Sequence, residues 1–139
     1  MLQAKDIMTS AIISVSPDSS LNDAMELIIA NRISGLLIID DTGRLVGILS
    51  EADRIRLIVD SETPDDGASV SEYMTRNVIS VKPDTDLAEI AELLMRSGIR
   101  RVPVVDNDDV LGLISRYDLM SAISKEKDSA TDGALASNC

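Results

Sequence analysis

Histidine and aromatic residues are almost missing from this chain of 139 residues. It has no His, Trp or Phe, two Tyr, and one Cys, Cys139, as its last residue. These absences exclude zinc sites built from Cys and His, catalytic triads that use His, and an internal disulfide. The remaining carboxylates, hydroxyls and lysines show no acid/base pair isolated in an apolar setting. We therefore predict no catalytic residues, no metal site and no enzyme activity.

Positive charge is also scarce. The chain has 13 Lys and Arg against 24 Asp and Glu, a formal net charge of −11 at pH 7. A negative field of this size repels phosphate backbones and anionic lipid surfaces, and few aromatic rings are available to stack on bases. No apolar run approaches the length of a membrane span, and the first residues lack the apolar segment of a signal peptide. The sequence predicts a cytoplasmic protein that binds neither nucleic acid nor membranes.

An internal repeat fills most of the chain. Met8-Thr9 recurs as Met74-Thr75, an offset of 66 residues, and the offset becomes 65 residues between Gly47 and Gly112. One copy buries too little surface to be stable alone, so we expect the two copies to pack together as one body. The predicted organisation is repeat 1 at residues 1–60, a linker at 61–70, repeat 2 at 71–124 and a disordered C-terminal tail at 125–139.

Each repeat has the pattern of a β-α-β-β-α unit, which places the chain in the mixed α/β (α+β) class. In the first copy, a capping-box pattern at Ser20 and Asp23 precedes a helix with one apolar stripe. Two short apolar runs at residues 36–39 and 45–49 then predict a β-hairpin, and a final helix begins at Ser50. The second copy repeats this pattern, with its final helix beginning at Ser115.

Several motifs recur in order and spacing in both copies. They are Asp6–Thr9, Ile13–Val15 with Pro17, Gly47–Asp53, Glu72–Thr75, Ile79–Val81 with Pro83, Arg101–Asp106 and Gly112–Asp118. Together they resemble tandem CBS domains, the Bateman module, over about residues 4–124. The resemblance implies two CBS repeats packed pseudo-symmetrically into one CBS-pair module, which pairs with a second chain as a disc-shaped homodimer and regulates a separate protein target.

The same resemblance implies a regulatory ligand that contains adenosine, of the AMP, ADP, ATP or S-adenosylmethionine class, in clefts between the paired sheets. In the family, the Asp of a Gly-x-x-Ser/Thr-x-x-Asp ending binds the ribose hydroxyls, and the Ser or Thr contacts phosphate or ribose. The ligand would signal by favouring one arrangement of the dimer. The second site would comprise Thr75, Val78, Ser80, Arg101, Pro103, Ser115, Arg116 and Asp118. The first site would comprise Thr9, Ile12, Ser14, Ser50 and Asp53.

The first copy departs from this pattern beside the expected phosphate position. Three residues differ from the second copy: Gly35 for Arg101, Leu37 for Pro103 and Glu51 for Arg116. Four arginines lie in the second copy or at its start: Arg76, Arg100, Arg101 and Arg116. A polyphosphate needs local cations in so acidic a chain, so the second site is the better candidate. Pro103 also indicates an edge strand or a position that faces ligand.

Three other interpretations remain open. Ser50 with Asp53, and Ser115 with Asp118, also have the spacing of an ordinary helix cap, and capping and ligand contact can coexist. The chain could be a ligand-free structural dimerisation or protein-interaction module, with its clefts filled by Leu37 and neighbouring aliphatic side chains. An enzyme with paired carboxylates is the third interpretation.

Overall fold

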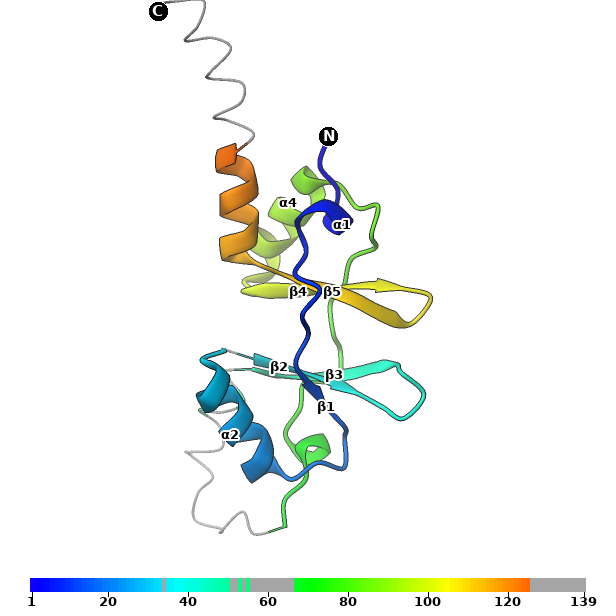
Figure 1. Cartoon of the computed structure of the whole chain (residues 1–139), viewed down its shortest axis with the longest axis vertical. Coiled ribbons are helices and arrows are strands. Elements are labelled where there is room, and N and C mark those ends of the chain that lie inside the picture. Colours follow the sequence, from blue (N-terminus) through cyan, green and yellow to red (C-terminus); the bar gives the residue numbers. More distant parts are fainter. Residues whose placement is uncertain (34, 51–52, 54, 56–66, 126–139) are drawn as a thin grey trace, which may run out of the picture. The chain divides into compact units, whose positions relative to one another are not determined.

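The computed structural model describes residues 1–33, 35–50, 53, 55 and 67–125 (Figure 1). Contacts divide the chain into two compact units. Unit 1 comprises Met1–Ser10, Ser80–Asp106 and the chain from Leu111 onward, and unit 2 comprises Ala11–Ile79 and Asn107–Val110. Residues 61–66 of the predicted linker and 126–139 of the predicted tail lie outside the described residues. Within the described ranges, no helix is long and apolar enough to cross a membrane.

Unit 2 is built on a three-stranded sheet (Figure 1). Strand β1 (Ser14–Val15) runs parallel to β2 (Gly35–Ile39), which pairs antiparallel with β3 (Leu45–Ser50). Helix α2 (Leu21–Asn31) connects β1 to β2, and the short 3-10 helix η1 (Val70–Glu72) follows the sheet in the chain. This order confirms the predicted strand, helix and hairpin of the first repeat.

Unit 1 contains the equivalent elements of the second repeat. Helix α4 (Leu87–Ser97) precedes β4 (Arg101–Asp106) and β5 (Asp109–Ser115), which form a two-stranded sheet. Residues 116–125 are helical, as the sequence predicts after Ser115. The short helix α1 (Ala4–Ile7) also lies in this unit. The mixed α and β class is therefore confirmed in both halves of the chain.

The two sheets share one strand register. Val15 pairs with Ile38 in parallel in unit 2, and the equivalent Val81 forms a parallel bridge with Val104 in unit 1. The N–H of Val81 donates to the carbonyl of Pro103 at 3.0 Å. Pro103 is buried, and its strand β4 pairs with β5 on one side and with Val81 on the other. The expected edge position is therefore not observed. Pro103 contributes its carbonyl to the pairing with Val81, which a residue without an N–H can still do.

Side-chain caps fix where the two long helices begin. Ser20 and Asp86 each accept the backbone N–H of the residue three positions later, at 3.0 Å, which satisfies one free donor of the first turn. Both helices end at a residue in the left-handed conformation, Arg32 with φ 52° after α2 and Gly98 with φ 71° after α4. Only Gly98 takes that conformation without steric cost.

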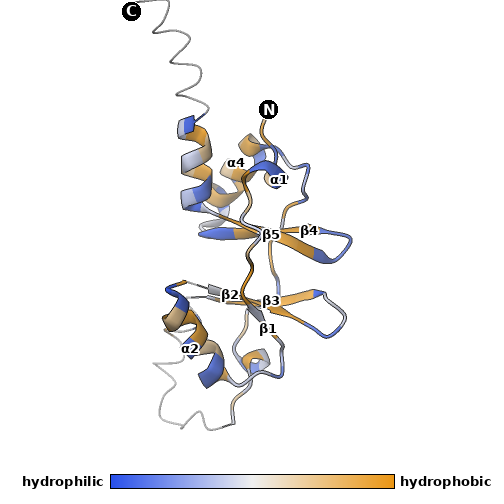
Figure 2. Cartoon of the chain, in the orientation of Figure 1, coloured by the Kyte–Doolittle hydropathy of each residue, from blue (hydrophilic) through white to orange (hydrophobic). Residues whose placement is uncertain are grey.

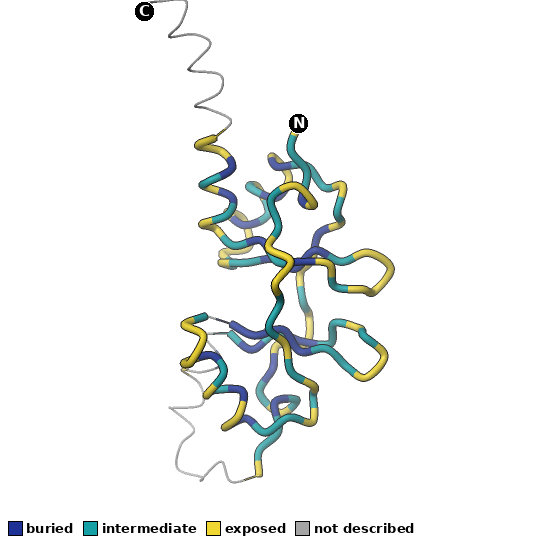
Figure 3. The backbone as a smooth tube through the Cα atoms, in the orientation of Figure 1, coloured by how far each residue is buried: buried dark blue, intermediate teal, exposed yellow. Residues whose placement is uncertain are grey.

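Each unit has its own aliphatic core. Apolar residues recur along the helices and strands of both units (Figure 2). The hairpin tips are exposed (Figure 3). The core of unit 1 comprises Ala4, Val81, Leu87, Ile90, Leu94, Val102, Val104, Ile114, Leu119 and Ala122. The core of unit 2 comprises Leu21, Ala24, Ile28, Leu36, Ile38, Leu49, Val70 and Met74.

The segment that begins each sequence repeat packs in the unit formed by the other repeat. In unit 1, Ala4 N–H donates to the carbonyl of Thr85 at 2.8 Å. In unit 2, the equivalent Val70 N–H donates to the carbonyl of Ser19 at 2.9 Å. Ala4 and Val70 are fully buried. The units therefore cut across the predicted repeats of residues 1–60 and 71–124, because residues 1–10 and 67–79 have exchanged places.

Two glycines allow these exchanged segments to lie against the strands. A Cβ on Gly47 in β3 would lie 2.4 Å from Met74 Sδ and 3.1 Å from the carbonyl oxygen of Thr75. A Cβ on Gly112 in β5 would lie 2.6 Å from Met8 Sδ and 2.9 Å from the carbonyl oxygen of Thr9. Only a residue without a side chain permits so close a backbone approach.

Candidate ligand site

The helix at residues 116–125 carries the candidate carboxylate of unit 1 in its first turn. Ser115 N–H donates to Asp118 Oδ2 at 2.9 Å, and Asp118 N–H donates to Ser115 Oγ at 3.1 Å. This reciprocal pair is a capping box, so the capping interpretation is confirmed here. Among the described residues, Asp118 Oδ1 accepts no hydrogen bond, and Asp118 is half-buried. Capping therefore leaves one carboxylate oxygen able to accept a hydroxyl from a ligand.

Thr9 lies beside this helix start, although it belongs to the first sequence repeat. Its N–H donates to the carbonyl of Leu113 at 2.9 Å, and its carbonyl accepts the N–H of Leu113 at 3.0 Å. These bonds hold Thr9 next to Leu113 of β5, and Leu113 precedes Ser115 by two residues. Unit 1 collects seven of the predicted site residues: Thr9, Ser80, Arg101, Pro103, Ser115, Arg116 and Asp118.

Arg116 links the start of the same helix to the end of α4. Its Nε donates to the carbonyl of Ile99 and its Nη2 to the carbonyl of Gly98, both at 3.2 Å. Carbonyls at a helix C-terminus lack helical partners and favour a nearby cation. A guanidinium has five N–H donors, so these two contacts do not exhaust Arg116. Arg116 is exposed and can still contact an anion.

The equivalent carboxylate of unit 2, Asp53, differs from Asp118 in its burial and in its hydrogen bonds. Asp53 is 4% exposed, and its Oδ2 accepts Ser50 N–H at 2.9 Å and Ser50 Oγ–H at 3.0 Å. Thr75 Oγ1 lies 3.3 Å from both carboxylate oxygens of Asp53. Unit 2 collects the other six predicted site residues: Ile12, Ser14, Ser50, Asp53, Thr75 and Val78.

The structure regroups the residues that the sequence assigned to each site. Thr75 and Val78 were assigned with Asp118, but both lie in unit 2, and Thr75 contacts Asp53. Thr9 was assigned with Asp53, but it lies in unit 1. The exchange of the early segments is the physical reason for both differences. Ile12 and Ser14 lie in the same unit as Asp53. The site assignments themselves stay predictions.

The arginines divide in the same way. Arg76 lies in unit 2, where its Nη2 donates to the carbonyl of Ser71 at 3.0 Å. Arg100, Arg101 and Arg116 lie in unit 1. Three of the four arginines that the sequence linked to the second site are therefore in the unit of Asp118. Glu51, which the sequence placed beside the phosphate position of the first site, lies outside the described residues.

Comparison with known proteins identifies this arrangement. The family model of the CBS domain matches residues 4–60 and 70–125. The chain belongs to the CBS-domain family. One relative, the protein MJ1426 of Methanocaldococcus jannaschii, is 32% identical over 86% of this chain and 89% of its own length. The resemblance found in the sequence motifs is thus confirmed.

Solved CBS-pair structures have the same fold. The chain is similar to Arabidopsis thaliana CBSX2 in complex with AMP, with a TM-score of 0.82 and 30% identity over 91% of this chain and 99% of that one. It is also similar to the CBS domain pair of protein MJ0100 in complex with 5′-methylthioadenosine and S-adenosylmethionine. That match has a TM-score of 0.79 and 28% identity over 91% and 98% of the two chains.

CBS pairs also occur within longer proteins. The chain spans 43% of the M. jannaschii protein MJ1225 and 23% of an inosine-5′-monophosphate dehydrogenase from the same organism. The module is therefore found both in proteins of its own size and attached to an enzyme.

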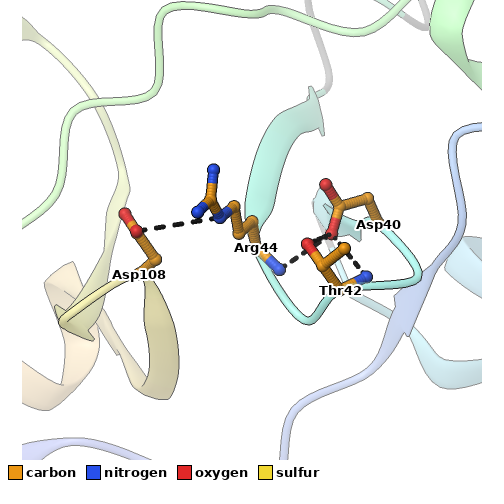
Figure 4. A network of polar contacts seen from close by, with 4 residues as sticks. All are labelled: Asp40, Thr42, Arg44 and Asp108. Atoms are coloured by element: carbon orange, nitrogen blue, oxygen red, sulfur yellow. Dashed lines mark hydrogen bonds and ion pairs between the residues drawn. The ribbon is translucent and has the colours of Figure 1, made fainter.

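Outside the two carboxylate sites, this CBS pair has an ordered polar turn between β2 and β3 (Figure 4). Asp40 Oδ1 accepts Thr42 Oγ1–H at 2.6 Å, Thr42 N–H at 2.9 Å and Arg44 N–H at 3.0 Å. These bonds hold the pKa of Asp40 below its usual range, and the bond from the Thr42 hydroxyl contributes most. The ion pair of Arg44 with Asp108, at 3.8 Å between exposed groups, adds little stability.

Thr42→Val is expected to raise the pKa of Asp40, because it removes the donor with the shortest bond to the carboxylate. A lowered pKa in the folded chain stabilises the fold above the unfolded pKa, and this contribution disappears as the pH falls through the folded value. Carboxyl ¹³C NMR titration of Asp40 checks the shift. Thr85→Val serves as the control and should leave the Asp40 titration unchanged. An unaltered Asp40 pKa in Thr42→Val would contradict the assigned cause.

Proposed function

We propose that this CBS pair is a regulatory module that binds an adenosine-containing compound, of the AMP, ADP, ATP or S-adenosylmethionine class, at Asp118 of unit 1. One observation carries the proposal: a half-buried carboxylate in the first turn of a helix, whose Oδ1 accepts no hydrogen bond from the described residues. Ribose has two adjacent hydroxyls, and the two oxygens of one carboxylate can accept both. Such charge-assisted hydrogen bonds are stronger than neutral ones.

The neighbours of Asp118 suit the rest of such a ligand. Ser115 lies at the start of the helix at residues 116–125, where free N–H groups and the helix dipole favour an anion. Arg101 and Arg116 supply the local positive charge that a phosphate needs in a chain of net charge −11. Thr9, beside β5, and Ser80 are the candidates for the border of the adenine ring.

The related structures support the adenosine class. CBSX2 was solved with AMP, and the MJ0100 pair with 5′-methylthioadenosine and S-adenosylmethionine. These ligands share an adenosine moiety and differ in what the ribose carries at its 5′ position. Recognition of the ribose diol by a carboxylate is compatible with all of them. The proposal includes no catalytic step, because the described residues around Asp118 include no acid/base pair isolated from solvent.

Asp118→Asn is expected to weaken binding about 100-fold, since the variant loses two charge-assisted hydrogen bonds to the diol. Asn keeps the size of Asp and an oxygen that can accept Ser115 N–H, so the helix cap remains. Calorimetric titration with AMP, ADP, ATP and S-adenosylmethionine, each with and without Mg²⁺, measures the affinity. Asp84→Asn makes the same charge change at an exposed position of the same unit and should bind like the wild type.

Two outcomes would count against this function. Wild-type affinity in Asp118→Asn would remove the site assignment. Absence of binding to every compound at millimolar concentration would favour the ligand-free interaction module. The buried state of Leu37, which is 2% exposed, is the observation that supports this second candidate.

We also propose that the module forms a homodimer whose arrangement changes with ligand and is read by a protein target. The two units expose large apolar side chains at equivalent helical positions. They are Ile29 and Met95 on α2 and α4, and Ile55 and Met120 on the helices that follow the hairpins. On each unit, these exposed apolar side chains are the candidates for contact with another chain. Light scattering should give twice the mass of one chain, and small-angle scattering should differ with and without AMP or S-adenosylmethionine.

A further inference from the structure

The two equivalent carboxylates differ in how much of their hydrogen-bonding capacity the chain itself uses. Asp118 accepts one hydrogen bond from the described residues, from Ser115 N–H, and is half-buried. Asp53 accepts Ser50 N–H, Ser50 Oγ–H and Thr75 Oγ1–H, and is 4% exposed. The same Ser-x-x-Asp sequence thus gives one carboxylate with spare acceptors and one that is largely satisfied.

The contacts of Asp53 have the chemistry expected of a bound ribose. Two hydroxyls, Ser50 Oγ and Thr75 Oγ1, donate to the one carboxylate, as the two hydroxyls of a ribose diol would. In unit 1, by contrast, Ser115 Oγ accepts the N–H of Asp118. The carboxylate therefore stays available to donors from a ligand. The chain therefore supplies its own pair of hydroxyls in unit 2 and none in the described part of unit 1.

Thr75 is held in place by the backbone. Its N–H donates to the carbonyl of Ile48 at 2.8 Å, and its carbonyl accepts Ile48 N–H at 3.0 Å. Gly47 permits this approach because it has no Cβ. A Cβ at this position would lie 3.1 Å from the Thr75 carbonyl oxygen. Thr75 itself is exposed, whereas Asp53 is buried.

We propose that Thr75 restricts this module to one nucleoside ligand per chain, by occupying the Asp53 carboxylate so that a ribose diol binds only Asp118. The proposal rests on the proposed function of Asp118 and adds the stoichiometry and the residue that sets it. The Thr75 contacts of 3.3 Å are long for an O–H donor and are shared between two oxygens. Their loss is therefore expected to raise the affinity of unit 2 by about tenfold, the lower end for a bond to a charged group.

The test is the number of AMP and S-adenosylmethionine equivalents bound per chain in calorimetric titration. Wild type should bind one equivalent in the concentration range that saturates Asp118, and Thr75→Ala should bind a second equivalent about tenfold more tightly than wild type does. Thr75→Ser retains the hydroxyl at the same backbone position and should bind one. In the double variant Thr75→Ala/Asp118→Asn, the remaining equivalent should bind in unit 2, with shifts of the Ser50 and Leu49 amide signals in NMR spectra.

The outcomes separate the two proposals. One equivalent in Thr75→Ala, or two equivalents already in wild type, overturns the role of Thr75 and leaves Asp118 as the ligand site. No binding by wild type but one equivalent in Thr75→Ala overturns the function of Asp118 and supports the role of Thr75. No binding by either chain overturns both. Circular dichroism and unfolding of each variant establish that a lost equivalent does not reflect a lost fold.

Discussion

Ala4→Asp is expected to destabilise unit 1 by about 3–5 kcal/mol, the usual consequence of an uncompensated buried charge. Ala4 is fully buried in the core of unit 1, and Leu2, Ile7 and Met8 pack against the same core. An acidic residue in the first turn of a helix gains about 0.3–1 kcal/mol from the helix dipole. Burial outweighs this gain, because α1 presents Ala4 to the core and has only four residues.

Thermal and urea unfolding measure the effect of Ala4→Asp. A loss of this size corresponds to a decrease in Tm on the order of 10 °C for a chain of this length. Lys5→Asp introduces the same side chain at the next position, which is exposed, and should change stability by less than about 1 kcal/mol. Equal losses in the two variants would contradict the packing of α1 in unit 1.

Gly112→Val is expected to cost about 3 kcal/mol, near the upper end of the range for an overpacked site. The added Cβ would lie 2.6 Å from Met8 Sδ, 2.8 Å from Met8 Cγ and 2.9 Å from the carbonyl oxygen of Thr9. Met8 can move its flexible side chain, whereas the Thr9 carbonyl is part of the backbone pairing with Leu113. We therefore expect the Thr9–Leu113 hydrogen bonds to lengthen or break.

A double-mutant cycle separates the two contacts of Gly112. Adding Met8→Ala to Gly112→Val should recover part of the lost stability. Met8→Ala removes the sulfur that the new Val side chain meets, but the clash with the Thr9 carbonyl remains. Amide hydrogen exchange at Leu113 reports on the backbone pair, and its protection should fall in Gly112→Val. Leu111→Val, one position earlier in β5 and partly exposed, should leave that protection in place. Unchanged stability in Gly112→Val would refute the close approach.

Local features of the fold were predictable because each depends on residues near one another in the chain. The helix starts at Ser20 and Asp86 follow from side chains that accept an N–H three residues later. The hairpins follow from two apolar runs separated by a turn, and the duplication of the motifs led to the family. The cap and hairpin signals are local, so they needed no long-range information, whereas the family was recognised from motifs that recur 65 or 66 residues apart.

The exchange of the early segments could not be predicted from local sequence signals. Met8-Thr9 and Met74-Thr75 are identical pairs, and each can pair with the strand of either repeat. Sequence alignment shows that the pairs are equivalent, but it does not show on which copy each one packs. The sequence therefore placed Thr75 with Asp118, whereas the structure places it with Asp53. For the same reason, the sequence did not predict that Asp53 and Asp118 accept different hydrogen bonds.

The exchange also affects the order in which the chain can fold during synthesis. Unit 2 is almost continuous in sequence, from Ala11 to Ile79, whereas unit 1 joins Met1–Ser10 to residues from Ser80 onward. The partners Thr9 and Leu113 are separated by 104 residues, the difference between their numbers. At about 5–20 residues per second, the ribosome needs on the order of 5–20 s to cover that distance. We therefore expect unit 2 to form first, while Met1–Ser10 wait until the residues from Ser80 onward have been synthesised.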